Sequence, residues 1–141
     1  MKQTDSSLPP SSTGDLRVFV VEDSMLVREL LIDNLAQIPG VAVIGFADSE
    51  DDALLRLHTL ACDVLVLDIE LKQGNGLSLL RNLRQHQRQM DSLKIIFSNN
   101  VSEPYRRLGE QLGVSHFFDK ASEFFTLYSL IERMGTCPSS R

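Results

Sequence analysis

The sequence is poor in the residues that build disulfide, zinc or membrane-spanning structures. Its 141 residues include no tryptophan and two cysteines, Cys62 and Cys137, too few for a disulfide framework or a zinc set. No apolar run approaches the roughly 20 residues of a membrane-spanning helix. Residues 1–14 are polar and lack the apolar core of a signal peptide. These absences predict a cytoplasmic protein with reduced thiols and no membrane segment.

Basic residues are in the minority. The sequence has 14 lysines and arginines against 19 acidic residues, so its formal net charge is −5. Because nucleic-acid-binding proteins usually carry a basic surface, this balance argues against DNA or RNA as a direct partner. The length fits one domain with a real core and excludes a large multidomain enzyme.

Short apolar runs alternate with longer stretches of helical spacing. The runs are rich in branched residues, as in strands buried on both faces of a parallel sheet. Each is followed by a stretch with apolar residues three or four positions apart, such as Val27, Leu31 and Leu35. We predict strands at Leu16–Val21, Val41–Phe46, Val64–Leu67, Lys94–Phe97 and His116–Phe118.

This alternation predicts one α/β domain. Five strand–helix units imply a doubly wound parallel sheet with helices on both faces. The domain is expected to span residues 16–134, between a tail at 1–15 and another at 135–141. Seven residues are too few for a second domain, so we expect the function to lie in this one domain.

Polar residues follow four of the predicted strands. Glu22 and Asp23 follow the first, Asp68 the third, Ser98 the fourth and Lys120 the fifth. Because parallel strands end on one edge, these side chains are expected to converge. Three neighbouring carboxylates repel one another and favour a bound cation, and oxygen ligands favour Mg²⁺ or Mn²⁺. A metal, an ammonium and a hydroxyl together suit phosphoryl transfer.

These residues resemble the motifs of the receiver domain of two-component response regulators. The spacing of 30 residues from Asp68 to Ser98 and of 22 from Ser98 to Lys120 is typical of that CheY-like family. Gly76 and Phe117 also stand at family positions. The motifs read Val20-Val21-Glu22-Asp23-Ser24, Val66-Leu67-Asp68, Ile96-Phe97-Ser98-Asn99 and Phe117-Phe118-Asp119-Lys120. The resemblance implies a flavodoxin-like sheet with strand order 2-1-3-4-5.

The resemblance also implies a role for each site residue. Asp68 would accept a phosphoryl group from a histidine kinase or a histidine phosphotransfer protein. Lys120 and Ser98 would contact that group, and Phe117 would turn inward as Ser98 moves. The implied Mg²⁺ ligands are Glu22, Asp23, Asp68 and the main-chain carbonyl of Glu70.

The implied output is a change in partner binding. The domain would be a signalling phosphoacceptor rather than an enzyme, apart from its own phosphorylation and dephosphorylation. The face formed by the fourth helix, fifth strand and fifth helix is a common dimer surface in the family, and the downstream partner is not named by the sequence.

Three features of the sequence depart from the family pattern. Ala121 stands where Pro usually follows the lysine, so we expect a trans Lys120–Ala121 bond and an altered loop. Leu71 and Lys72 replace a Met-Pro pair, and Asn99 replaces a small residue. We expect the side chains of Glu70, Asn99 and Asn100 to tune the lifetime of the phosphoryl group.

Other interpretations stay open at this point. A pseudo-receiver would keep the fold and bind partners without phosphorylation. A flavin- or nucleotide-binding protein would need a phosphate-binding loop after the first strand, where Glu22 and Asp23 would repel phosphate. A phosphatase with an aspartate nucleophile would need a second aspartate at the position of Glu70.

Overall fold

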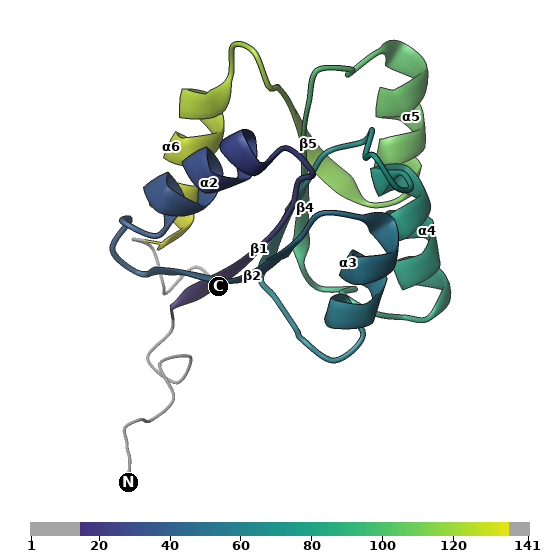
Figure 1. The fold of residues 1–141 in the computed structure, drawn as a ribbon, viewed down its shortest axis with the longest axis horizontal. Coiled ribbons are helices and arrows are strands. Elements are labelled where there is room, and N and C mark those ends of the chain that lie inside the picture. The colour runs from purple at the N-terminus through teal and green to yellow at the C-terminus, as the bar shows by residue number, and fades with distance from the viewer. Residues whose placement is uncertain (1–14, 136–141) are drawn as a thin grey trace, which may run out of the picture.

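The computed structural model describes residues 15–135, which form a five-stranded sheet flanked by helices (Figure 1). The strand order is β2-β1-β3-β4-β5, and every neighbouring pair is parallel. This confirms the predicted doubly wound fold and its order 2-1-3-4-5. The strands are β1 (Leu16–Val21), β2 (Val41–Ala47), β3 (Val64–Leu67), β4 (Leu93–Ser98) and β5 (Val114–Asp119).

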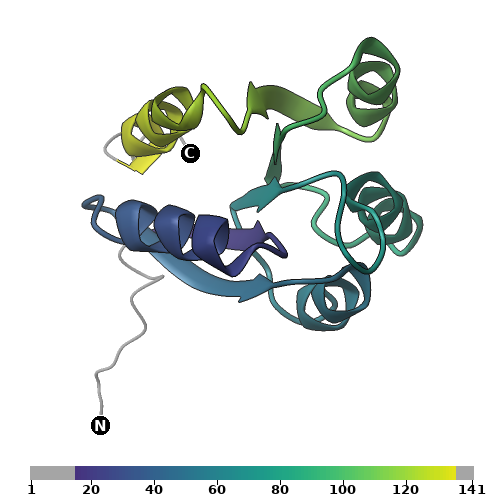
Figure 2. The same ribbon diagram turned by 45° about the horizontal axis from the view of Figure 1, so that its top comes forward.

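Helices cover both faces of the sheet. Two of them lie against one face and three against the other, as two views show (Figures 1 and 2). The pair is α2 (Met25–Leu35) and α6 (Phe124–Gly135), and the three are α3 (Glu50–Leu57), α4 (Gly76–Gln85) and α5 (Glu103–Gln111). Each face therefore has its own apolar core.

The two cores follow from the alternation of side chains along the strands. Val18 and Val20 point to the core that Leu31 and Leu127 complete from α2 and α6. Phe19 and its alternate neighbours point to the opposite core. Because both faces are covered, all four residues of β3 are buried, which accounts for their uninterrupted apolar sequence.

Polar side chains cap the first turns of three helices. The Ser24 hydroxyl accepts a hydrogen bond from the backbone N–H of Val27 at the start of α2. Ser49 caps α3 in the same way, and the Asn75 side chain accepts from the first N–H groups of α4. These caps satisfy donors that a helix leaves unpaired.

Some element boundaries extend beyond the predicted ones. β4 includes Ser98, which pairs with Asp119 at the end of β5, and β5 begins two residues early at Val114. Backbone pairing does not require apolar side chains, so the apolar runs alone predict strands that are too short. The helix α6 includes Gly135, which was assigned to the tail.

Residues 1–14 and 136–141 of the expected tails lie outside the described residues, and Cys137 is among them. Within residues 15–135, no helix has the length and apolar character needed to cross a membrane.

Candidate functional site

Three carboxylates converge at the carboxyl edge of the sheet. Glu22 and Asp23 follow β1, and Asp68 follows the neighbouring strand β3. One oxygen of each lies within 4.8 Å of the others. Glu22 and Asp68 are buried, with 1% and 6% of their surface exposed. The predicted acidic cluster is therefore formed, and it is largely shielded from solvent.

Lys120 reaches into this cluster from the loop after β5. Its Nζ lies 2.6 Å from an oxygen of Asp68 and 2.9 Å from an oxygen of Glu22. Burial alone would lower the pKa of Lys120, but its hydrogen bonds to the two carboxylates outweigh burial and raise it. Lys120 is therefore a firmly charged cation at the centre of the site.

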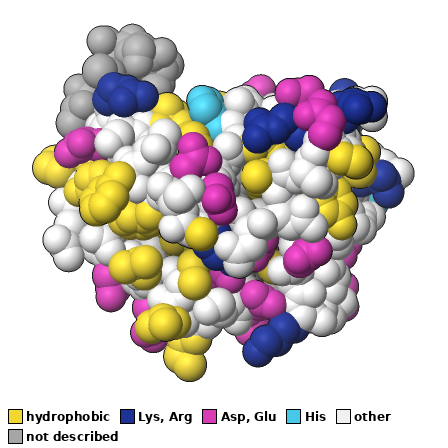
Figure 3. All heavy atoms as spheres, turned by 90° about the horizontal axis from the view of Figure 1, so that it is seen from above, with side chains coloured by type: hydrophobic (Ala, Val, Ile, Leu, Met, Phe, Trp, Pro, Cys, Tyr) yellow, Lys and Arg dark blue, Asp and Glu magenta, His cyan; other side chains and the backbone are white. Residues whose placement is uncertain are grey.

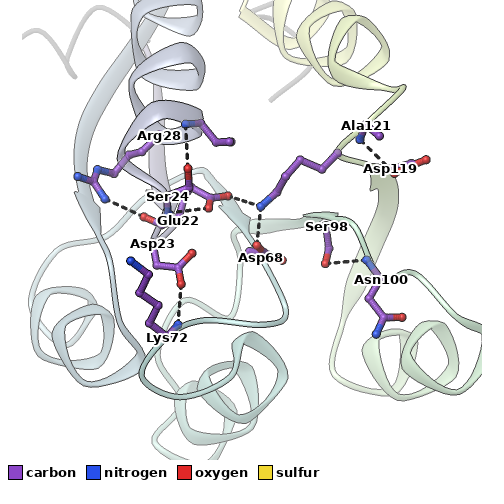
Figure 4. A network of polar contacts seen from close by, with 12 residues as sticks. Glu22, Asp23, Ser24, Arg28, Asp68, Lys72, Ser98, Asn100, Asp119 and Ala121 are labelled. Atoms are coloured by element: carbon purple, nitrogen blue, oxygen red, sulfur yellow. Dashed lines mark hydrogen bonds and ion pairs between the residues drawn. The ribbon is translucent and has the colours of Figure 1, made fainter.

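Glu22 is held by more than Lys120. Its second carboxylate oxygen accepts from the backbone N–H of Ser24 at 3.0 Å, and its carbonyl accepts from Arg28 (Figure 4). Burial raises the pKa of Glu22 in spite of these contacts. The site thus holds a carboxylate in an environment that opposes its charge.

The donor set fits a hard divalent cation. If all are ionised, three carboxylates against one ammonium leave two negative charges uncompensated. Such an excess favours a cation that prefers oxygen ligands, which describes Mg²⁺ and Mn²⁺ better than zinc. Asp23 is half-buried, and one of its oxygens accepts from the N–H of Lys72 at 2.6 Å. Its other oxygen has no hydrogen bond among the described residues.

Ser98 lies at the end of β4 and is 1% exposed. Its hydroxyl accepts from the N–H of Asn100 at 3.2 Å, and among the described residues it makes no hydrogen bond to Asp68 (Figure 4). Its carbonyl accepts from the N–H of Lys120. Ser98 therefore contacts the loop after β4 through its hydroxyl and the backbone of Lys120 through its carbonyl.

The side chains expected to tune lifetime do not behave alike. Asn100 donates through its amide to a carboxylate oxygen of Glu70 at 3.3 Å, which joins the loops after β4 and β3. Asn99 is exposed and has no side-chain contact of this kind in the described residues. The structure thus brings Glu70 and Asn100 together and leaves Asn99 apart.

Phe117 is half-buried on β5, and its ring contacts two residues of α5, Gly109 and Arg106. A methyl group added at Gly109 would come within 2.7 Å of its ring. The guanidinium of Arg106 lies 4.9 Å from the ring centroid, in cation–π geometry. The sequence did not mark Arg106, because no motif relates an arginine on a helix to an aromatic residue on the next strand.

Hydrogen bonds to the side chain of Asp119 hold the loop after Lys120, where Ala121 stands in place of the family's usual proline. The carboxylate of Asp119 accepts from the N–H of Ala121 at 3.1 Å and from the hydroxyl of Ser122 at 3.0 Å. The N–H of Asp119 donates to the carboxylate of Glu123. No cis peptide bond occurs in residues 15–135, which confirms the expected trans Lys120–Ala121 bond.

Comparisons with known proteins agree with this geometry. The family model described as the response regulator receiver domain matches residues 18–132. The chain is 47% identical over 75 residues to "Protein-glutamate methylesterase/protein-glutamine glutaminase 5" of Anaeromyxobacter dehalogenans, a match that covers 53% of this chain and 21% of that protein. It is 32% identical over 114 residues to a protein of the same description from Clostridium acetobutylicum, covering 79% of this chain and 32% of that one.

Solved structures give the same result for the fold. A two-component response regulator of the LuxR family from Aurantimonas sp. SI85-9A1 is similar with a TM-score of 0.72 and 26% identity, over 85% of this chain and 84% of that one. The response regulator domain of Thermotoga maritima CheB gives a TM-score of 0.72 at 24% identity, over 88% and 96%. The chain spans about a fifth to a third of the length of the curated relatives it matches.

Proposed function

Because this chain belongs to the response regulator receiver domain family, we propose that Asp68 is its phosphoacceptor residue. A carboxylate oxygen of Asp68 attacks the phosphorus of a phosphohistidine on a histidine kinase or phosphotransfer protein. The new O–P bond makes an acyl phosphate as the P–N bond breaks, and the histidine leaves as neutral imidazole after taking up a proton. The observation that carries the proposal is Lys120 Nζ at 2.6 Å from Asp68.

The neighbouring side chains suit this reaction. Lys120 pairs with Asp68 before transfer and can pair with a phosphoryl oxygen afterwards, because one ammonium offers three donors. We assign the metal site to the side chains of Glu22, Asp23 and Asp68 and to the carbonyl of Glu70. A bound Mg²⁺ would supply positive charge for the phosphoryl oxygens. We propose no catalytic activity for the described domain other than its own phosphorylation and dephosphorylation.

We assign the switch to Ser98 and Phe117. A phosphoryl group on Asp68 adds hydrogen-bond acceptors near Ser98, whose hydroxyl now accepts from Asn100 and can rotate to donate. Movement of Ser98 would open space for Phe117, whose ring now lies against α5. Phosphorylation needs only to favour one of two existing arrangements for the surface of α5 and β5 to change.

Exposed apolar side chains beside the site suit the approach of a donor protein. Met25 and Leu26 at the start of α2 and Phe125 on α6 are 61%, 80% and 80% exposed. The view from above shows hydrophobic side chains gathered on the α2 and α6 side of the acidic ones (Figure 3). Since transfer requires the donor histidine to reach Asp68, a protein donor must cover this surface. A second protein contact, self-association, is proposed through the face of α5, β5 and α6.

Intact-protein mass spectrometry with acetyl phosphate and Mg²⁺ tests the function. The wild type should gain one phosphoryl group, and Asp68→Asn should gain none. The control is Asp33→Asn, an exposed aspartate on α2, which should be phosphorylated as the wild type is. A wild type that gains no phosphoryl group at any Mg²⁺ concentration would instead support a phosphorylation-independent pseudo-receiver.

The proposed tuning of lifetime has its own test. Because Glu70 and Asn100 contact each other, Glu70→Gln and Asn100→Ala should each change the decay rate of the phosphoprotein. Asn99→Ala should change it less, since Asn99 makes no such contact. Decay that is unchanged in both of the first two variants would contradict the proposal.

A further inference from the structure

The loop between Asp68 and α4 is bonded to the start of α3. One carboxylate oxygen of Glu50 accepts from the backbone N–H of Asn75 at 3.0 Å. The other accepts from the hydroxyl of Ser78 at 2.7 Å and lies 3.5 Å from the amide nitrogen of Asn82. A single half-buried side chain of α3 thus holds the end of this loop and the first turns of α4.

The loop holds α3 in return. The N–H of Glu50 donates to the carbonyl of Gln73 at 3.0 Å, and the N–H of Asp51 donates to the Gln73 side chain at 3.1 Å. The first N–H groups of a helix have no partner within the helix, so these contacts satisfy both elements at once. We call Glu50 and Gln73, with these reciprocal bonds, the α3 clamp.

The backbone of the loop lies very close to the side chain of Glu50. Gly74 has a φ of +91°, and a methyl group added to it would lie 2.2 Å from Cβ of Glu50. The loop therefore rests directly on the aliphatic part of Glu50. Only glycine combines this positive φ with the absence of a side chain.

The other side of the loop is tied to the acidic cluster. The N–H of Lys72 donates to Asp23 at 2.6 Å, so a carboxylate of the site and the loop fix each other. Glu70 pairs with Asn75 in an isolated antiparallel bridge, and the N–H of Gly76 donates to the carbonyl of Ile69. Glu70 thus belongs to a loop that Asp23 anchors at Lys72 and that the α3 clamp anchors at Gln73 and Asn75.

We propose that Glu50 is a positioning residue for the metal site, acting through Asn75 and Gln73. By holding the loop it fixes the carbonyl of Glu70 and, through Lys72, the carboxylate of Asp23. A metal site whose ligands are already in place binds its ion with less loss of freedom, and residues that orient ligands alter metal affinity by about 10- to 100-fold. This inference rests on the proposed function, because the ligand set comes from it.

The α3 clamp is tested by Mg²⁺ titration of the 141-residue chain carrying Glu50→Ala. Calorimetry of Mg²⁺ binding should show an affinity about tenfold weaker than the wild type, at the low end of that range. Phosphorylation by acetyl phosphate should need correspondingly more Mg²⁺ but reach a similar rate at saturating Mg²⁺. In Mg²⁺-free buffer, hydrogen exchange should show lost protection of the amide of Asn75.

Three further variants separate positioning from general damage. Gln73→Ala removes the side-chain acceptor of the Asp51 N–H but keeps the backbone carbonyl that accepts from Glu50, so it should weaken Mg²⁺ binding less than Glu50→Ala does. Glu50→Gln keeps an acceptor for Asn75 and should bind Mg²⁺ within about threefold of the wild type, since most of the hydrogen bonding survives. Asp51→Ala removes the same charge from the same helical turn, and because only its backbone contacts the loop, it should match the wild type.

The outcomes distinguish this inference from the function it rests on. Unchanged Mg²⁺ affinity in Glu50→Ala, with a wild type that binds Mg²⁺ and is phosphorylated, would overturn the inference alone. A fall in affinity that Asp51→Ala shares equally would also overturn it, because charge rather than position would be the cause. A wild type that binds no Mg²⁺ would overturn the proposed function as well.

Discussion

The two edges of the sheet bury charged groups in opposite ways. At the carboxyl edge, Lys120 is shared by Glu22 and Asp68, and carboxylates outnumber cations. At the amino edge, Lys94 is also buried, at 8% exposure, but its ammonium donates to the backbone carbonyls of Gln89 and Ser92. One edge gathers carboxylates in excess over cations, and the other holds a single buried ammonium whose hydrogen bonds go to backbone carbonyls.

Other polar groups at the amino edge are equally well satisfied. The Gln89 amide donates to the carbonyls of Leu57 and Leu60 and accepts from the N–H of Cys62. The guanidinium of Arg17 makes two hydrogen bonds to the carboxylate of Asp63. A cavity of about 400 Å³ lies here, lined partly by these residues.

The two edges show how a charged group that stabilises the fold differs from one that binds a ligand. Groups whose partners are all present stabilise the fold and have little reason to bind anything else. Groups that crowd like charges together are poised to bind a cation or a phosphoryl group. Lysines on neighbouring stretches of one small domain can thus have different roles, and the partner atoms reveal which.

The sharpest comparison is between the two lysines. Lys120→Met should lower the rate of phosphorylation by acetyl phosphate by about 100-fold or more, because it removes the donor nearest to Asp68. Lys94→Met should leave that rate within about twofold, since Lys94 contacts no group of the site. Rates are measured by intact mass at saturating Mg²⁺. Comparable losses in both variants would break the distinction.

Mg²⁺ should stabilise the protein through one edge only. At a free Mg²⁺ concentration of about 100 times the dissociation constant, binding should add about 2.7 kcal/mol to the free energy of unfolding. Asp23→Asn should lose most of this gain, because it removes one carboxylate charge from the cluster. Lys94→Met should keep the gain. Urea unfolding with and without Mg²⁺ measures it, and a gain that survives in Asp23→Asn would contradict the assigned ligand.

Gln89 provides the matching test at the amino edge. Gln89→Ala should lower the free energy of unfolding by about 2 kcal/mol, because it leaves buried backbone groups of the α3–β3 loop without partners. Gln87→Ala is the control, since Gln87 shares a positive φ, 55° against 57°, but its exposed side chain makes no such bonds. It should change stability by less than about 0.5 kcal/mol. Equal losses would assign the effect to backbone strain.

The smallest expected effect is a contrast in pH dependence. The pKa of Lys120 is raised in the folded protein, so its stabilising contribution is present below 10.5 and is lost as pH rises through the folded value. Burial lowers the pKa of Lys94, so the cost of its charge diminishes as pH rises through its folded value towards 10.5. Relative to the wild type, Lys120→Met should therefore gain stability at high pH and Lys94→Met should lose it. Urea unfolding in Mg²⁺-free buffer at several alkaline pH values measures both, and slopes of the same sign would refute the contrast.

Much of the fold could be predicted because its signals are local. The apolar run of β3 and the helical spacing of Val27, Leu31 and Leu35 each depend on a few nearby residues, and the structure places both as expected. The convergence of Asp68 with Lys120 was also predictable, because parallel strands end on one edge.

Other features depend on pairs far apart in the chain. The bonds between Glu50 and Asn75 involve an acid that looks in the sequence like an ordinary first-turn residue of a helix. The closure of the loop by Asp119 replaces a proline with side-chain hydrogen bonds that no spacing rule marks. Such contacts depend on how loops lie across one another, which apolar periodicity does not encode.

The site draws its parts from nearly the whole length of the domain. Glu22 follows the first strand and Lys120 the last, while Asp68 lies between them in the middle of the sheet. A piece of the chain that contains all three groups must span residues 22–120, and removing β1 or β3 would divide the sheet. The site therefore has to be transferred to another protein as the whole sheet with its helices. A chimaera that joins it to another protein should cut before Leu16 and after Gly135.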